Sequence, residues 1–222
     1  MIEMRPKRVF VFDNNGTGLD DLHVAFGSVE AIFAVLGLRS PNKDQYRNEI
    51  GADFMDFYWR HGVPRDITGE QLNVIRKLYY RMRQNTAHYR PDFEPLLRYC
   101  ESVGAEVGMC SAEIPEVLQG FLERAKLTQY FDANLICGGA RPSKTPVLAS
   151  MAQRLGLHPS ECVYVDDTDD GIKAAQKAGF FAIGFTNATG YNSARRIHDA
   201  HPDLVVSSFT ELKRVLPKLI EG

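Results

Sequence analysis

Polar side chains that could take part in catalysis or metal binding follow three of the apolar runs in this sequence. Asp13 comes directly after the run RVFVF, Ser111 follows a second run, and the acidic loop DDTDD at 166–170 follows a third. Lys144 stands just before a segment with helical spacing. Several carboxylates gathered in one pocket would repel and raise one another's pKa values, and a hard cation such as Mg²⁺ relieves that repulsion.

These residue types suit phosphoryl transfer. Lys144 can pair, as a compact positive charge, with Asp13 and with an anionic substrate. The Ser111 hydroxyl and the backbone N–H groups of Ala112 and Glu113, where a strand passes into a helix, would suit a phosphate. A carboxylate beside a metal ion can attack phosphorus and form an aspartyl-phosphate. The pattern therefore predicts a site that binds Mg²⁺ and a phosphoryl group.

The elements that would carry these residues alternate between helix and strand patterns from residue 93 onward. Short apolar runs predict the strands, and the segments between them have helical spacing. Such alternation indicates βαβ units and a parallel sheet, in which ligands bind beyond the carboxyl ends of the strands. The expected strands are 8–12, 105–110, 133–137, 162–165, 180–185 and 204–206.

The segment after the first strand has a different pattern. Helical spacing covers 19–38 and 69–84, and 43–61 indicates one or two shorter helices. No strand signal is present across 19–88. The first strand is thus separated from the others by a helical insertion.

We therefore expect an α/β fold with two parts. The length of 222 residues exceeds the roughly 150 of an average domain, which leaves room for an added unit. A Rossmann-like parallel sheet core should comprise residues 1–17 and 90–222, and an inserted α-helical domain should comprise residues 18–89.

The composition limits which classes of partner and which cellular compartment we expect for this protein. The net charge is −2, from 26 basic and 28 acidic residues, so no overall basic field points to nucleic acid or a membrane surface. The longest apolar run, 31–38, is far shorter than the roughly 20 residues of a membrane span, and no signal-peptide core is visible. The four cysteines form no CxxC pair, so we expect buried free thiols in a reducing cytoplasm.

One stretch departs from the balanced charge. Arg76 to Arg90 holds five basic residues and no acidic one. It is either a solvated helix face or a surface that helps to hold an anionic substrate. Tyr79 and Tyr80 within it are interpreted as packing residues rather than a stacking platform for a nucleotide.

Four segments, in order, resemble the motifs of the haloacid dehalogenase (HAD) superfamily. The run RVFVFDNNGTGLDD is similar to motif one, and Ala105 to Ser111 looks like motif two, a strand that ends in Ser or Thr. Lys144 matches the motif-three lysine, and VYVDDTDDGIKAAQKAGF matches motif four. The match covers nearly the whole chain, and the insertion at 18–89 resembles the helical cap of phosphoglycolate-phosphatase-like members.

The resemblance implies a role for each matched residue. Asp13 would be the nucleophile and a metal ligand, and Asn15 stands at the acid/base position, where the backbone carbonyl usually binds Mg²⁺. Lys144 and Ser111 would neutralise and hold the phosphoryl group, and Asp167 would complete the metal site. The implied activity is that of a Mg²⁺-dependent phosphatase whose cap closes over its substrate.

Motifs three and four depart from the pattern. Asp166 replaces the usual glycine before the motif-four aspartate, and Gly171 stands where the second acid of that motif often lies. Asp170 is assigned as the second acid and metal ligand, with Asp166 as the alternative. Arg141 precedes a proline as the usual motif-three lysine does, so it competes with Lys144 for that role.

Asn15 is the departure with the largest consequence. An amide has no proton to lend at neutral pH, and loss of a general acid or base typically lowers a rate by about 10² to 10⁴. Two explanations stay open: a catalytically impaired relative that binds a phosphorylated ligand or partner, or an asparagine introduced to stall the reaction. Hydrolysis of a carbon–halogen bond is a weaker alternative, because such relatives need no metal and the loop at 166–170 is rich in acids.

Overall fold

Six strands form one parallel sheet at the centre of the protein. The computed structural model describes residues 6–51 and 53–221, and the strand order is β5-β4-β1-β6-β7-β8. Every neighbouring pair runs parallel, so the carboxyl ends of the strands share one edge of the sheet. The strands are β1 Val9–Phe12, β4 Glu106–Cys110, β5 Ile136–Cys137, β6 Cys162–Asp166, β7 Phe181–Phe185 and β8 Leu204–Val206. The predicted α/β class is confirmed.

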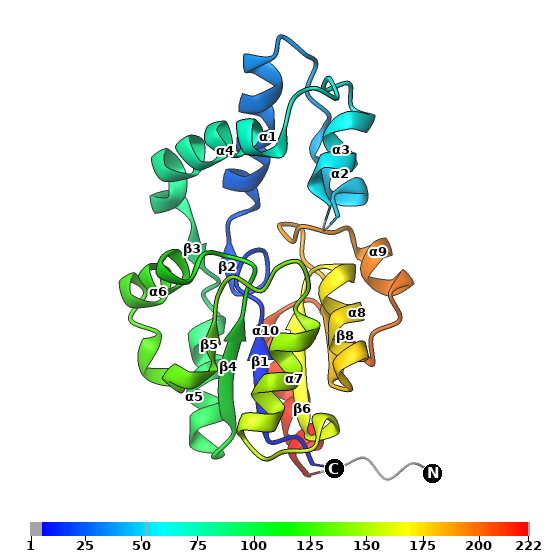
Figure 1. The fold of residues 1–222 in the computed structure, drawn as a ribbon. Helices are drawn as coiled ribbons and strands as arrows, with labels where there is room; N and C mark the ends of the chain where they lie inside the picture. Colours follow the sequence, from blue (N-terminus) through cyan, green and yellow to red (C-terminus); the bar gives the residue numbers. More distant parts are fainter. Residues whose placement is uncertain (1–5, 52, 222) are drawn as a thin grey trace.

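Helices cover both faces of this sheet (Figure 1). On β1, Phe10 and Phe12 point into one apolar cluster, while Val9 and Val11 point into the other. The first face is covered by α5 Phe93–Ser102, α6 Pro115–Arg124 and α10 Phe209–Glu221. The second face is covered by α7 Thr145–Arg154, α8 Asp169–Ala178 and α9 Ala194–Asp199. Burial on both sides holds the ends of the central strands in a rigid frame.

Helices α1 to α4 form a second unit with an apolar cluster of its own. Their bounds are α1 Leu22–Val35, α2 Lys43–Glu49, α3 Phe54–Arg60 and α4 Gly69–Arg83. Figure 1 shows them gathered at one end of the molecule, beyond the sheet. Asn42 and Thr68 begin α2 and α4 with capping boxes, in which each side chain accepts a hydrogen bond from the N–H three residues on.

Two short strands lie where the chain enters and leaves the α1–α4 unit. β2 Leu19–Asp20 pairs antiparallel with β3 His88–Tyr89. The prediction of no strand across 19–88 is therefore wrong at both ends, because a two-residue strand carries no periodic signal. The pattern also gives no sign of α9, and the strand expected at 133–137 is a 3₁₀-helix followed by β5. The described 3₁₀-helices are Gln84–Thr86, Thr128–Tyr130, Ala133–Leu135 and Pro159–Glu161.

The cysteines and the helices can be compared with two expectations from the sequence. Cys100, Cys110 and Cys162 are buried, Cys137 is half-buried, and all of them are free thiols. In the described part of the chain, no helix is both long and apolar enough to span a bilayer. Residues 1–5 and 222 of the expected core lie outside the described residues.

Candidate active site

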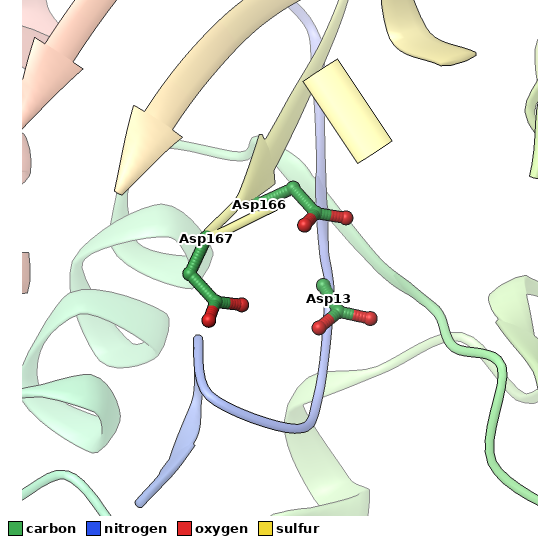
Figure 2. Close-up of side chains that lie close together, drawn as sticks. All are labelled: Asp13, Asp166 and Asp167. Atoms are coloured by element: carbon green, nitrogen blue, oxygen red, sulfur yellow. The ribbon is translucent and has the colours of Figure 1, made fainter. Parts of the chain in front are cut away.

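The ends of adjacent strands bring acidic side chains together. β1 lies between β4 and β6, and Asp13 follows β1 directly, with its N–H donating to the Val165 carbonyl at 2.9 Å. Asp166 is the last residue of β6, and Asp167 follows it. One carboxylate oxygen from each of Asp13, Asp166 and Asp167 lies within 4.8 Å of the other two (Figure 2). These side chains are buried, so they form a concentrated negative charge at the edge of the sheet.

Lys144 supplies positive charge to this group. Its Nζ lies 2.6 Å from Asp13 Oδ1 and 2.6 Å from Asp166 Oδ2, so it bridges carboxylates from neighbouring strands. Burial by itself lowers the pKa of Lys144, but these two carboxylates raise it above its usual range, and the amine stays protonated. Arg141 does not take this place, because its Nε points to the Ala112 carbonyl at 3.4 Å.

Asp167 is held by loops on two sides. Its Oδ1 accepts a hydrogen bond from Thr17 Oγ1 at 2.8 Å, and its Oδ2 accepts one from the Tyr191 N–H. A Cβ at Gly16 would overlap Asp167 Oδ2, and the φ of 81° at Gly16 is one that glycine adopts most readily. The glycine in the loop after β1 is therefore needed for the close approach of this loop to Asp167.

The second carboxylate from the acidic loop is that of Asp166. It is fully buried, and its Oδ1 accepts hydrogen bonds from the N–H and Oγ1 of Thr168 at 2.8 and 2.6 Å. Asp170 is exposed and lies outside the group of three carboxylates. Gly171 leaves the space that Asp166 fills, because a Cβ there would overlap Asp166 Oδ2. The assignment of Asp170 as the second acid is therefore corrected, because the structure places Asp166, and not Asp170, beside Lys144.

Burial and the repulsion of neighbouring carboxylates raise the pKa values of Asp13 and Asp167. Burial is the largest cause for Asp13, whose pKa lies well above its usual range although Lys144 lowers it. Asp167 has a pKa of about 7, raised by burial and by the charge of Asp166 and lowered in part by its hydrogen bonds. One lysine therefore does not compensate the charge of three buried carboxylates.

Asn15 points its two amide atoms at different groups. Its Nδ2 donates to Asp21 Oδ2 at 2.7 Å, and its Oδ1 accepts from Ser111 Oγ at 3.4 Å. Ser111 is buried directly after β4, and its Oγ also accepts from the Glu113 N–H at 3.1 Å. The Glu113 N–H that was expected to bind phosphate is therefore bonded within the protein, which leaves Ser111 and the adjacent Ala112 as the candidates.

Arg90 and Asp21 are site residues that the sequence pattern does not reveal. Arg90 is buried and donates to the carbonyls of Thr17 at 2.8 Å and Gly16 at 2.7 Å, which fixes the loop after β1. The basic stretch thus ends in a residue that supports the site. Asp21 is fully buried and accepts from Tyr80 Oη at 3.1 Å, so Tyr80 does more than pack. The one feature of the sequence that could have indicated Asp21 is the acidic pair Asp20–Asp21 at the end of motif one.

The oxygen atoms around Asp13 are of the kind that coordinates a hard cation such as Mg²⁺. The carbonyls of residues 13, 14, 16 and 17 accept hydrogen bonds at 3.4, 2.7, 2.7 and 2.8 Å. No described residue donates a hydrogen bond to the Asn15 carbonyl, so that oxygen is available to an ion. Carboxylate and carbonyl oxygens are the ligands that Mg²⁺ prefers. Asp13, Asp167 and the Asn15 carbonyl could therefore hold the ion, with Asp166 beside them.

Comparisons with known sequences show which family this chain resembles. Residues 10–185 match the model of the family described as haloacid dehalogenase-like hydrolase. The chain is 26% identical to a phosphoglycolate phosphatase of Yersinia pestis over 223 residues, which cover 96% of this chain and 94% of that protein. It is 29% identical to a phosphoglycolate phosphatase of Salmonella typhimurium over 160 residues, which cover 68% of this chain and 62% of that protein.

Solved structures share the fold over nearly the full length. A haloacid dehalogenase-like protein of unknown function from Agrobacterium tumefaciens has a TM-score of 0.78 at 22% identity, over 96% of this chain and 99% of that one. A HAD family hydrolase from Deinococcus radiodurans, solved with bound phosphate and sodium, has a TM-score of 0.76 at 20% identity, over 96% of each chain. Because the family model spans most of the sequence and the fold agrees, this chain belongs to the haloacid dehalogenase-like hydrolases.

Proposed function

We propose that this protein is a Mg²⁺-dependent phosphatase that hydrolyses a small phosphorylated metabolite. The observation that carries the proposal is the position of the Asp13 carboxylate, which Lys144 binds beside two further buried carboxylates. A carboxylate in such a place suits both nucleophilic attack and metal binding. The relatives from Yersinia and Salmonella are named phosphoglycolate phosphatases, which supports this reaction class and makes phosphoglycolate the first substrate to test.

Asp13 attacks the phosphorus atom in the proposed reaction. Lys144 holds Oδ1, so Oδ2 forms the new bond to phosphorus while the bond to the ester oxygen breaks. Because Asn15 carries no acidic proton, the leaving oxygen takes its proton from water. A second water molecule then attacks the aspartyl-phosphate, which releases inorganic phosphate and restores the carboxylate. Bound Mg²⁺ would add positive charge at the phosphoryl oxygens.

Lys144, Ser111 and Ala112 bind the transferred phosphoryl group. Lys144 stays protonated between two carboxylates, so it offers positive charge beside the attacking oxygen. Ser111 and Ala112 follow β4, the neighbour of β1, and their Oγ and backbone N–H groups suit phosphoryl oxygens. Lys144 on one side, and Ser111 with Ala112 on the other, therefore stabilise the negative charge that develops in the transition state.

We infer that residues 18–89 act as a cap on a core of residues 1–17 and 90–222. Helices α1 to α4 have their own apolar cluster, and Tyr80 on α4 reaches the loop after β1 through Asp21. Closure of such a unit excludes water and selects the substrate. We place the reaction in the cytoplasm, because free thiols suit a reducing compartment.

Phosphate release from phosphoglycolate, measured with Mg²⁺ and with EDTA, tests the proposal. The wild-type protein should be active with Mg²⁺ and inactive with EDTA. Asp13→Asn should lower the rate about 10³-fold or more, since it removes the nucleophile. Asp199→Asn, a matched change at a side chain that is 69% exposed, should keep the wild-type rate. Activity that persists in Asp13→Asn or in EDTA would contradict the proposal.

A further inference from the structure

Asp21 is a buried carboxylate that the proposed reaction does not use. Its side chain is fully buried, and it forms no salt bridge with any lysine, arginine or histidine of the described residues. Its Oδ2 accepts hydrogen bonds from Asn15 Nδ2 at 2.7 Å, Tyr191 Oη at 2.9 Å and Tyr80 Oη at 3.1 Å. Its Oδ1 accepts one from the Gly16 N–H at 3.0 Å. Neutral donors thus satisfy a charge that is usually buried only beside a cation.

The donors to Asp21 come from three parts of the fold. Asn15 and Gly16 lie in the loop after β1, Tyr80 lies on α4, and Tyr191 lies between β7 and α9. Asp21 itself immediately precedes α1. The carboxylate therefore connects the loop that carries Asp13 with the helical unit.

Asp21 determines which way the Asn15 amide points. Both oxygens of Asp21 act as acceptors here, Oδ1 for the Gly16 N–H and Oδ2 for two tyrosine hydroxyls, so the NH₂ group of Asn15 faces it as a further donor. The Asn15 Oδ1 is then turned toward Asn14 Nδ2 at 3.2 Å and Ser111 Oγ at 3.4 Å. Turning the amide over would place Oδ1 where Nδ2 now lies, 2.7 Å from a carboxylate oxygen. Asp21 therefore makes Asn15 present an acceptor, and not a donor, on the side of Ser111.

We propose that Asn15 and Asp21 are a matched amide–carboxylate pair, in which Asp21 is a positioning residue for the side chain at position 15. What that side chain does to a substrate rests on the proposed function, whereas the pairing rests on the hydrogen bonds themselves. A carboxylate at the half-buried position 15 would lie 2.7 Å from the fully buried carboxylate of Asp21, and like charges so close repel strongly.

The pair has a consequence for the missing acid/base group. Asn15→Asp by itself is not a repair, because Asp21 opposes the new charge. Asp21→Asn must accompany it, since the exchange again sets one NH₂ group against one carboxylate. The tyrosine hydroxyls can serve either arrangement, because each can donate or accept.

Thermal unfolding of four full-length proteins tests the pairing: the wild type, Asn15→Asp, Asp21→Asn and the variant with both changes. It is measured at pH 8 without metal. Asn15→Asp should lower Tm by roughly 6 °C or more, because it sets a second, uncompensated charge against the buried carboxylate of Asp21. The double variant should regain most of that loss. A Tm of Asn15→Asp equal to that of the wild type, or losses that simply add in the double variant, would overturn the pairing.

Asn192→Asp is the matched control for burying a carboxylate. Asn192 is more deeply buried than the half-buried Asn15, but its Oδ1 accepts a hydrogen bond from the Asp169 N–H at 2.9 Å, so an acid there keeps its donor. This variant should lower Tm much less than Asn15→Asp does. Equal losses would mean that burial, and not the proximity of Asp21, causes the effect.

Phosphate release from phosphoglycolate with Mg²⁺ tests the positioning role. The double variant holds its new carboxylate with an amide, so its kcat should exceed that of Asn15→Asp by at least about 10²-fold, with KM little changed. Equal kcat values in these two variants would overturn the positioning role of Asp21. If neither the wild type nor any variant releases phosphate, the proposed function fails, and the unfolding measurements still decide the pairing.

Discussion

The carboxylate of Asp166 fills the space beside Gly171, where a Cβ would overlap its Oδ2. From there it binds Lys144 Nζ at 2.6 Å. Position 171 lies in the first turn of α8, so an acidic side chain at that position would occupy the same space if position 166 were glycine. The two departures from motif four, Asp166 in place of glycine and Gly171 in place of an acid, therefore amount to one change. The carboxylate has moved between two positions that are adjacent in space.

This exchange predicts a rescue by reversal. Asp166→Gly should lower kcat roughly 10²- to 10³-fold, because Lys144 loses a partner that fixes it beside Asp13. Asp166→Gly combined with Gly171→Asp should regain at least about tenfold. Gly171→Asp alone should lose activity, because its side chain meets that of Asp166. Steady-state phosphate release measures each variant, and a double variant no faster than Asp166→Gly would contradict the exchange.

Lys144 should also be important for stability. Lys144→Met leaves the buried carboxylates of Asp13 and Asp166 without a cation, so we expect the free energy of unfolding to fall by about 3–5 kcal/mol. Urea unfolding at pH 8 without metal measures this loss. Lys173→Met is the control, because Lys173 is half-exposed and pairs with Asp169 on a helix surface, which contributes only about 0.3–0.5 kcal/mol. Similar losses in the two variants would rule out the special position of Lys144.

Arg47 on α2 connects the α1–α4 unit to the loop after β7. Its Nε donates to the Gly190 carbonyl at 2.8 Å, and its Nη2 donates to the Asn187 carbonyl at 2.7 Å. The same loop donates the Tyr191 N–H to Asp167. One guanidinium therefore fixes both the position of α2 and the loop that orients a candidate metal ligand.

Loss of the hydrogen bonds from Arg47 should weaken metal binding at the site. Arg47→Met should speed hydrogen exchange at 187–192 and weaken Mg²⁺ binding, measured by calorimetry, about 10-fold or more, because the loop that holds Asp167 is released. Arg195→Met is the control, since Arg195 is exposed and pairs only loosely with Asp199 at 3.6 Å. Exchange rates in Arg47→Met that match the wild type would disprove this connection.

The acids of the site should make the stability of the protein depend on pH. Asp167 has a pKa of about 7 in the folded protein, raised by burial and by Asp166 from a usual value of 3.8. An acid with a raised pKa binds more protons in the folded than in the unfolded state between these two values. Its contribution to the free energy of unfolding is therefore complete below about pH 4 and is lost as the pH rises to about 7.

Mg²⁺ should reverse this loss, because it binds the ionised carboxylates. Urea unfolding at pH 5 and pH 8, with and without Mg²⁺, measures the effect. At about 100 times its Kd the ion should add about 2.7 kcal/mol at pH 8 and less at pH 5. Asp167→Asn should reduce both the pH dependence without metal and the stabilisation by Mg²⁺. An equal pH dependence in this variant and in the wild type would show that Asp167 is not the group responsible.

Long periodic segments were predicted well, and short ones were not. The helix expected at 69–84 is α4, Gly69–Arg83, because its apolar stripe repeats over several turns. β2, β3 and α9 are too short for such a repeat, and their positions follow from contacts with distant segments. Asp13, Ser111 and Asp167 could be expected near one another, because each follows a strand of one parallel sheet.

The choice among neighbouring candidates needed the folded structure. Lys144 and Arg141, and likewise Asp166 and Asp170, lie within a few residues of each other, and sequence spacing does not tell which side chain turns inward. The backbone direction at the end of β6 and at the start of α7 decides that, and it results from packing on both faces of the sheet. Asp21 illustrates the same limit, because donors from α4 and from the loop after β7 satisfy its buried charge, and only tertiary contacts bring them together. The order of strands along the chain thus places the site, and long-range packing selects the side chains that form it.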